Sequence, residues 1–438
     1  MGAVERYADE ICREIRERQE EIRATLGLNT LYIGGGTPSV LPLPVLRRIV
    51  EALSEVTGVP VGPAAAVCAE GAGVRERCRA SADWRERCRA AADERERDQA
   101  AADGRYEEFT IEVNPEDIVE RGPEFVRGLL ELGVTRISMG VQSLDDGILR
   151  WMNRRHDAAR ARQAWQILRE AAEAFPPSQI YGRGKHLPVC SLSVDLIIGV
   201  PGMTDDILSE TLKELVAWRP DHISAYQLSI EEGSTLAERI AAGKEKELPE
   251  DECRAQYEMV CQALAAAGYE HYEISNWALP GRRSIHNSAY WTRRPYVGLG
   301  PGAHSLEAGA TSPCLRGPGE DSLKGGIGRP DRSGPGEDSP EGGLQRRSWN
   351  SKALSGWTRE GEVLTPEEVR EERIMLGLRT ADGVEPELLA KEAQAGSVRQ
   401  SVAGAAWRLP DGLEWNGGHI RIAENDWFVA DEIIANLI

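Results

Sequence analysis

The residues of this chain best suited to bind a polar ligand occur within or just after short apolar segments. A carboxylate among apolar residues needs a partner, an amide both donates and accepts hydrogen bonds, and glycines let a ligand approach the backbone closely. The residues concerned are Gly35, Gly36, Thr37, Glu112, Gln142 and Asp195. For each position alone, a tight turn or a structural polar contact is an equally simple interpretation. Their recurrence on successive segments favours a single site for a ligand with ribose, amine and carboxylate groups.

Alternating strand-like and helix-like segments position these residues. The predicted strands are 30–33, 109–113, 135–141, 193–198 and 222–228, and the helical patterns that follow them are 42–56, 123–132, 145–174, 204–218 and 249–267. An amphipathic helix from Val4 to Ile22 precedes them. Repeated strand–helix units predict parallel strands, whose carboxyl ends meet at one edge. Because the predicted strands are mostly apolar, we expect an α/β barrel in which both faces of the sheet are covered.

Two segments have compositions unsuited to a packed core. Residues 58–106 contain three near-copies of a ten-residue charged unit, and residues 313–346 repeat a Gly-, Pro- and Ser-rich unit. We interpret the first as a solvated or disordered insertion and the second as a flexible loop. The barrel is accordingly assigned to 1–275 and a linker region to 276–312. Short helices at 365–377 and 386–395, a strand at 419–423 and a helix at 427–437 predict a small C-terminal domain of winged-helix type over 347–438.

Composition narrows the class of protein. The net charge is 52 − 71 = −19, so we expect no nucleic-acid partner, with the Arg-rich stretch 75–97 as the only local exception. No apolar run approaches the length of a membrane span, and the first 25 residues lack the apolar stretch of a secretory signal. These features predict a cytoplasmic protein. Its eight cysteines show no metal-binding spacing, so we interpret them as reduced and structural or incidental.

A histidine beside aromatic residues forms a second candidate site. His286 begins the run HNSAYW, which also contains Tyr290 and Trp291. Imidazole can ligate haem iron, and aromatic rings can stack on a porphyrin. A histidine that satisfies a loop backbone is an equally simple interpretation of the residues alone. His304 is a second and weaker candidate.

Long, ordered motifs in this chain resemble a known family. They are LYIGGGTPSVL, FTIEVNPEDI, GVTRISMGVQSLDDGILRWMNRRH, SVDLIIGVPGMT and HISAYQLSIEEGS, followed by YEISNWA, HNSAYW and YVGLGPGAHS. This series resembles the radical S-adenosylmethionine proteins of the HemN/HemW group, over nearly the whole chain except the two insertions. The resemblance implies a partial (β/α)6 barrel that lacks its first strand here. Residues implied to hold S-adenosylmethionine are Gly35, Gly36, Thr37, Glu112, Gln142, Arg154 and Asp195.

The resemblance also implies a [4Fe–4S] cluster, for which this sequence has no matching ligands. The family carries CxxxCxxC on a loop after its first strand, before the helix that here begins at Val4, and the 438 residues contain no such motif. A truncated N-terminus and a genuine loss of radical chemistry are both compatible with this. We favour truncation, because a core strand is missing together with the loop and an exposed barrel edge is a liability. Truncation predicts that the upstream coding DNA, read in frame, contains CxxxCxxC.

Three functions follow from the resemblance. The run HNSAYW matches the HNxxYW motif of the haem chaperones in the group, which implies that His286, Tyr290 and Trp291 bind haem for transfer to an acceptor protein whose identity is open. The alternative is an enzyme of porphyrin biosynthesis, an oxygen-independent coproporphyrinogen III oxidase. A third is a degenerate binding protein without radical chemistry. Whether the chain is an enzyme stays open at this point.

Overall fold

The computed structural model describes residues 2–25, 30–62, 106–175, 190–307, 345–353, 355–389 and 409–438. Most of the two predicted insertions, the Arg-rich stretch 75–97 and four of the cysteines (Cys68, Cys78, Cys88 and Cys314) therefore lie outside the described residues. Residues 345 and 346, the last two of the predicted second insertion, lie in a strand.

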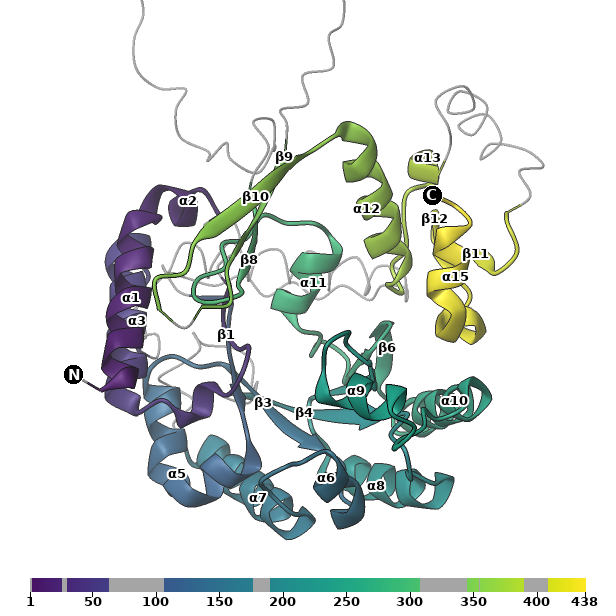
Figure 1. The fold of residues 1–438 in the computed structure, drawn as a ribbon, viewed down its shortest axis with the longest axis horizontal. Helices are drawn as coiled ribbons and strands as arrows, with labels where there is room; N and C mark the ends of the chain where they lie inside the picture. The colour runs from purple at the N-terminus through teal and green to yellow at the C-terminus, as the bar shows by residue number, and fades with distance from the viewer. Residues whose placement is uncertain are drawn as a thin grey trace, which may run out of the picture.

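A curled seven-stranded sheet forms a half-barrel at the centre of the molecule (Figure 1). Its strands, in spatial order, are β1 Thr30–Ile33, β2 Glu108–Val113, β3 Arg136–Gln142, β4 Ser191–Ile198, β5 His222–Gln227, β7 Asn276–Ala278 and β6 Glu270–Glu273. The five strands β1 to β5 are parallel, which confirms the predicted α/β class. The antiparallel pair β6 and β7, which the sequence analysis did not predict, extends the sheet beyond β5.

Helices form an arc around the outside of the sheet (Figure 1). They are α1 Ala3–Glu17, α2 Gln19–Ala24, α3 Leu43–Thr57, α5 Pro115–Glu131, α6 Asp146–Trp151, α7 Ala158–Ala174, α8 Asp205–Trp218, α9 Thr235–Ala241 and α10 Glu250–Ala266. The helix predicted at 123–132 begins earlier, at Pro115, and is interrupted at Gly122, where φ is 70°. The helical pattern 145–174 forms two helices, since Asp157 caps a new one after the loop that follows Trp151.

The two faces of the sheet have opposite character, which corrects the expectation that both would be apolar. On the outer face of β2, Phe109, Ile111 and Val113 are buried beneath the helices. The inner face of the same strand presents Glu108 and Thr110 together with Glu112. The other parallel strands follow the same two-residue period, with Ser138, Ser193 and Ser224 facing inward. The barrel interior is therefore polar, and the apolar core lies between sheet and helices.

The remaining elements lie around the open side of the half-barrel. They are α11 Ile285–Trp291, β8 His304–Leu306, β9 Gln345–Asn350, β10 Arg359–Leu364, α12 Pro366–Leu378, α13 Pro386–Leu389, β11 Leu413–Asn416, β12 His419–Ile422, the 3-10 helix η4 Glu424–Val429 and α15 Ala430–Ala435. The helix predicted at 365–377 and the strand at 419–423 are confirmed. The helix predicted at 427–437 is a 3-10 turn followed by the short α15.

The predicted linker and C-terminal domain share one small sheet. Strand β8 pairs with β9, and β9 pairs with β10, so this sheet joins residues on both sides of the second insertion. Trp427 and Ile420 in the C-terminal region are buried in the same apolar core as the barrel strands. The domain boundaries and the winged-helix assignment stay predictions.

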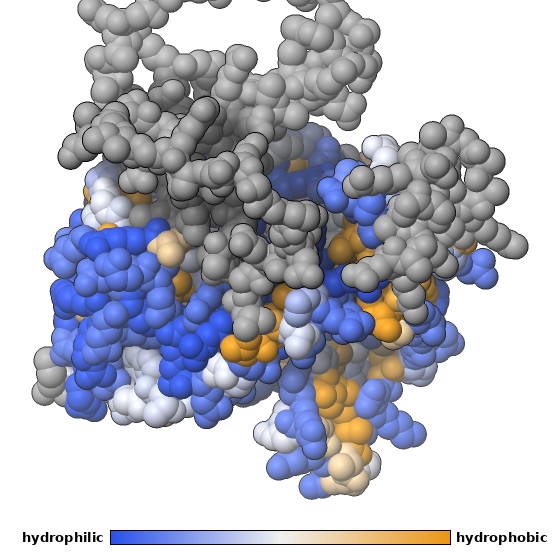
Figure 2. All heavy atoms as spheres, turned by 90° about the horizontal axis from the view of Figure 1, so that it is seen from above, coloured by the Kyte–Doolittle hydropathy of each residue, from blue (hydrophilic) through white to orange (hydrophobic). Residues whose placement is uncertain are grey.

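The described part of the surface is largely hydrophilic. In the view from above, hydrophilic residues cover much of the described surface, and apolar residues appear as smaller areas (Figure 2). Among the helices that the structure describes, none is both long and apolar enough to cross a membrane.

Candidate functional site

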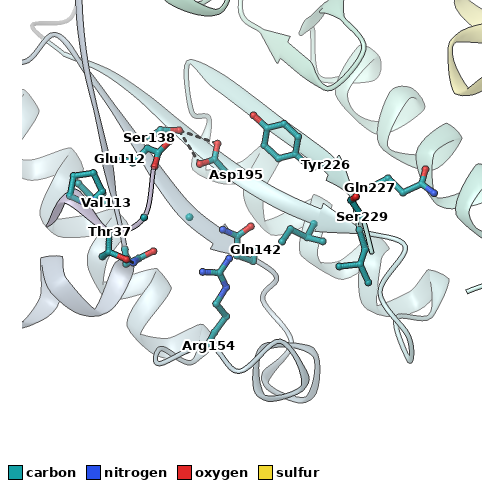
Figure 3. A pocket seen from close by; sticks show the side chains of 16 residues that line it. Thr37, Glu112, Val113, Ser138, Gln142, Arg154, Asp195, Tyr226, Gln227 and Ser229 are labelled. Atoms are coloured by element: carbon teal, nitrogen blue, oxygen red, sulfur yellow. Dashed lines mark hydrogen bonds between the residues drawn. The ribbon is translucent and has the colours of Figure 1, made fainter. Parts of the chain in front are cut away.

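A pocket of about 400 Å³ lies at the carboxyl ends of the parallel strands (Figure 3). It is lined by Gly36, Thr37, Pro38, Glu112, Val113, Asn114, Ser138, Gly140, Gln142, Arg154, Asp195, Ile197, Tyr226, Gln227, Leu228 and Ser229. All of the residues predicted for a polar ligand are in this set except Gly35, whose backbone N–H donates to Glu112 at 3.1 Å. The structure thus brings together side chains from β2, β3 and β4 with the loops after β1 and α6.

The three glycines of the loop after β1 are required for two different structural reasons. A Cβ at Gly34 would overlap the Tyr32 ring and lie 2.7 Å from Glu112 Oε1. Gly35 and Gly36 adopt φ values of 76° and 110°, which residues with a Cβ rarely adopt, and open space faces both. The loop therefore turns sharply while leaving room for a ligand beside it.

Side chains of the next strand and helix hold this loop in place. Asn114 Nδ2 donates to Thr37 Oγ1 at 3.3 Å, and the Asn114 N–H donates to Ser39 Oγ at 3.2 Å. Ser39 in turn donates to the buried Asp117 carboxylate at 2.6 Å. The position of Thr37 in the pocket is therefore set by polar contacts from the start of α5.

Two carboxylates face each other across the interior. Glu112 Oε1 accepts a hydrogen bond from the Tyr32 hydroxyl at 2.5 Å. Asp195 accepts from Ser138 Oγ, at 3.0 and 3.1 Å to its two oxygens (Figure 3). Burial raises the pKa of Asp195 to about 6, against the opposing effect of the hydrogen bonds from Ser224 and Ser138. Asp195 is accordingly ionised at pH 7 but titrates close to it.

Gln142 and Arg154 close the pocket on the side of β3. Gln142 is a non-glycine residue with φ of 66°, and the β3–β4 register shifts beside it. Such a backbone conformation is costly and is found at functional sites. Arg154 lies in the loop between α6 and α7, and its guanidinium points towards Gln142 (Figure 3). Burial lowers the pKa of Arg154, which remains a cation at neutral pH.

A smaller cavity of about 90 Å³ continues the polar interior towards α11. It shares Glu112, Ser138, Asp195 and Tyr226 with the larger pocket, and its other lining residues are Tyr32, Thr110, Arg136, Ser193, His222, Ser224, Ser284 and Asn287. Tyr32, Arg136, His222 and Tyr226 were not predicted from the sequence. The signal was present, because polar and apolar residues alternate along each of these strands, but the strands were interpreted as mostly apolar on both faces.

A buried ion pair connects the barrel to α11. Arg136 Nε donates to Glu108 Oε2 at 2.9 Å, and both side chains are at most 7% exposed. The Glu108 carboxylate also accepts from Ser284 Oγ and from the backbone N–H groups of Ile285 and His286, at 3.0 to 3.1 Å. These contacts hold the Glu108 pKa low although burial opposes ionisation. The first turn of α11 is therefore attached to β2.

The predicted histidine site lies at this attached helix. The His286 ring stacks on Tyr32, with centroids 4.8 Å apart and planes 18° apart. Nδ1 is 2.9 Å from Thr30 Oγ1, and Nε2 is 3.0 Å from the hydroxyl of Tyr290, which is 40% exposed. Burial lowers the pKa of His286, so the imidazole is neutral at pH 7.

The other predicted residues of this region differ in their surroundings. Trp291 is half-buried at the end of α11. His304 is exposed on β8, where its ring lies 6.2 Å from that of Trp349 and apart from the His286 cluster.

A [4Fe–4S] cluster needs several ligand side chains close together. Within the described ranges, no group of three His, Cys, Asp or Glu side chains could hold a metal ion. The described cysteines, Cys12, Cys190, Cys253 and Cys261, are free. These residues do not fit a [4Fe–4S] cluster, whereas the carboxylates, amide and glycine loop of the large pocket fit a nucleoside carrying an amino-acid group.

Comparisons with known proteins agree with this arrangement. Residues 3–215 match the model of the Radical SAM superfamily. The chain is 28% identical to the heme chaperone HemW of Lactococcus lactis, over 64% of this chain and 58% of that protein. It is 37% identical to the heme chaperone HemW of Mycobacterium tuberculosis H37Rv, over 45% of this chain and 46% of that protein. The cattle protein named radical S-adenosyl methionine domain-containing protein 1, mitochondrial, is 33% identical to this chain, over 63% of this chain and 48% of that protein. The chain thus spans about half the length of the curated relatives it matches.

The fold comparison points to the same class. Coproporphyrinogen III oxidase (HemN) from Escherichia coli superimposes with a TM-score of 0.59, over 99% of this chain and 82% of that one, at 16% identity. The half-barrel is the fold expected from the match to the Radical SAM superfamily. Within that superfamily, the sequence of this chain is similar to that of the HemW proteins.

The Glu108–Arg136 pair gives a testable stability prediction. Glu108→Gln leaves the buried Arg136 charge without its partner and weakens the attachment of α11, so the free energy of unfolding should fall by about 3 kcal/mol. Urea unfolding followed by circular dichroism measures this. The matched control is Glu124→Gln, which removes the partner of Arg127 in an exposed pair and should change stability by about 0.5 kcal/mol or less. Equal effects of the two substitutions would contradict the role given to Glu108.

Proposed function

We propose that this chain is a haem-binding chaperone that takes S-adenosylmethionine in the large pocket, binds haem at His286 and passes it to an acceptor protein. The observation that carries the proposal is a neutral, aromatic-flanked imidazole attached to the strand that supplies the pocket's Glu112. The names of the curated relatives, heme chaperone HemW, support the same function.

The pocket offers a complementary group for each part of S-adenosylmethionine. Glu112 and Asp195 are acceptors for ribose hydroxyls or for the ammonium group, and Arg154 is a cation for the carboxylate. Gly35, Gly36 and Thr37 present an open backbone edge with a hydroxyl, and Gln142 can donate and accept. Such binding requires no side chain beyond those that the structure brings together.

The His286 cluster has the properties expected of a haem site. Ligation of iron uses a neutral imidazole nitrogen, and Nε2 is the nitrogen that faces the hydroxyl of Tyr290, a residue that is 40% exposed. Haem binding through Nε2 requires Tyr290 to give up this contact, while Nδ1 keeps its partner Thr30. Tyr290 and Trp291 supply aromatic surface for the macrocycle.

Fewer observations support the oxidase alternative than the chaperone. The likeness to coproporphyrinogen III oxidase, at 16% identity, concerns the fold alone. The run HNSAYW favours the chaperone, because it resembles the motif of that branch of the family. Formation of a decarboxylated product from coproporphyrinogen III would favour the enzyme instead.

Haem titration tests the site. Followed by the Soret absorbance, the chain should bind haem saturably at one equivalent, and His286→Ala should weaken binding at least about tenfold because the iron loses its ligand. His304→Ala is the control, since this exposed histidine lies outside the cluster, and it should bind like the parent chain. Equal binding by His286→Ala and the parent would refute the assignment of His286.

The titration of Asp195 predicts how cofactor binding depends on pH. Because the pKa of Asp195 is about 6, this side chain is ionised in only about a tenth of the protein molecules at pH 5. Affinity for S-adenosylmethionine should therefore rise about tenfold from pH 5 to pH 7.5, as measured by calorimetry. Asp195→Asn should bind weakly with little pH dependence, and the exposed Asp205→Asn should retain the full dependence. A flat profile for the parent chain would contradict the role of Asp195.

A further inference from the structure

Tyr32 is the one side chain of β1 that contacts both candidate sites in the described structure. Its hydroxyl donates to Glu112 Oε1 at 2.5 Å in the large pocket, and its ring lies against His286. It belongs to neither predicted ligand set. Burial and the nearby Glu112 carboxylate raise the pKa of Tyr32, so it is a phenol that donates its proton to Glu112.

The packing around Tyr32 fixes its ring between the two sites. A Cβ at position 34 would overlap the Tyr32 ring and crowd the Glu112 carboxylate, and Gly34 leaves that space to them. On the other side the ring is nearly parallel to the imidazole, which Thr30 holds through Nδ1. Tyr32 therefore orients His286 for as long as its hydroxyl remains bonded to Glu112.

Both oxygens of Glu112 have partners in this structure. Oε1 accepts from Tyr32, and Oε2 accepts from the Gly35 N–H at 3.1 Å. Each carboxylate oxygen can accept two hydrogen bonds, so the hydroxyl groups of a ligand can bond to Glu112 beside these donors. They then share its negative charge with Tyr32, which weakens the bond from Tyr32 and favours its release.

We propose that Tyr32 is a positioning residue that couples the two sites, so that S-adenosylmethionine bound at Glu112 frees Tyr32, loosens the orientation of His286 and weakens haem binding. This inference rests on the proposed function. It adds that the nucleoside acts as a signal for haem release. A ligand shifts such an equilibrium only through its different affinity for the two states, and the effect is reciprocal.

The test is haem titration of the full chain with and without saturating S-adenosylmethionine. For the parent chain, the cofactor should raise the dissociation constant for haem at least about fivefold, which is at the low end of measured couplings. Tyr32→Phe keeps the ring but lacks the bond to Glu112. It should bind haem about fivefold more weakly even without the cofactor, and the cofactor should then change its affinity less than about twofold.

A matched control separates coupling from general damage. Tyr269→Phe also removes a buried tyrosine hydroxyl, which donates to the Pro220 carbonyl at 2.7 Å and to neither Glu112 nor His286. It should show the coupling of the parent chain. If Tyr32→Phe is poorly folded by circular dichroism, Glu112→Gln replaces it, since an amide weakens the same bond and should also reduce the coupling.

The outcomes distinguish this inference from the proposed function. If the parent chain binds both ligands but independently, or if haem binds more tightly with the cofactor, the coupling is refuted and the chaperone proposal stands. The coupling is equally refuted if Tyr32→Phe retains it in full. If the parent chain binds no haem or no S-adenosylmethionine, the proposed function fails and the inference fails with it.

Discussion

The ion pair between Arg136 and Glu108 is the interaction on which the arrangement of the two sites depends. A buried arginine is costly unless its charge is compensated, and Glu108 compensates it while also accepting the backbone N–H groups at the start of α11. Without that carboxylate, the helix bearing His286 would have no charged anchor on the parallel strands in the described structure. The haem proposal therefore depends on a residue that contacts neither proposed ligand.

The geometry of β2 extends this attachment to the pocket. Side chains two residues apart in a strand face the same way, so Glu108 and Glu112 both point into the interior, separated by about 13 Å along the strand. Glu108 holds α11, and Glu112 holds the loop after β1 through Gly35. One strand thus fixes the positions of both sites, and Tyr32 on the neighbouring strand contacts both.

Much of the fold could be predicted from the sequence because the outer faces of the strands and the inner faces of the helices are apolar and periodic. Glu112, Gln142 and Asp195 were found because they interrupt apolar stretches at strand ends. Arg136 and His222 were missed because a polar or charged residue at the beginning of a strand is usually exposed, and only the tertiary structure shows these two to be buried. The hairpin β6–β7 was missed because its strands have four and three residues and Glu273, a buried acid, interrupts the pattern.

The contact of Tyr32 with Glu112 and His286 could not be predicted from spacing, since the three residues lie on β1, β2 and α11, far apart in the chain. What the sequence did contain was the glycine at position 34 that makes this contact sterically possible. Gly34 is required by the neighbouring tyrosine and glutamate, whereas its two successors are required by their backbone conformations. A single glycine-rich motif therefore meets two different physical needs.

We propose that the cofactor pocket and the helix bearing His286 respond as one unit. Amide hydrogen exchange with and without S-adenosylmethionine measures this most directly, because it reports on the pocket loop, α11 and a distant helix in the same sample. We expect slower exchange in residues 34–39 and faster exchange in residues 284–292 when the cofactor binds, with no change in α8. Protection of the pocket loop without any change in residues 284–292 would contradict it.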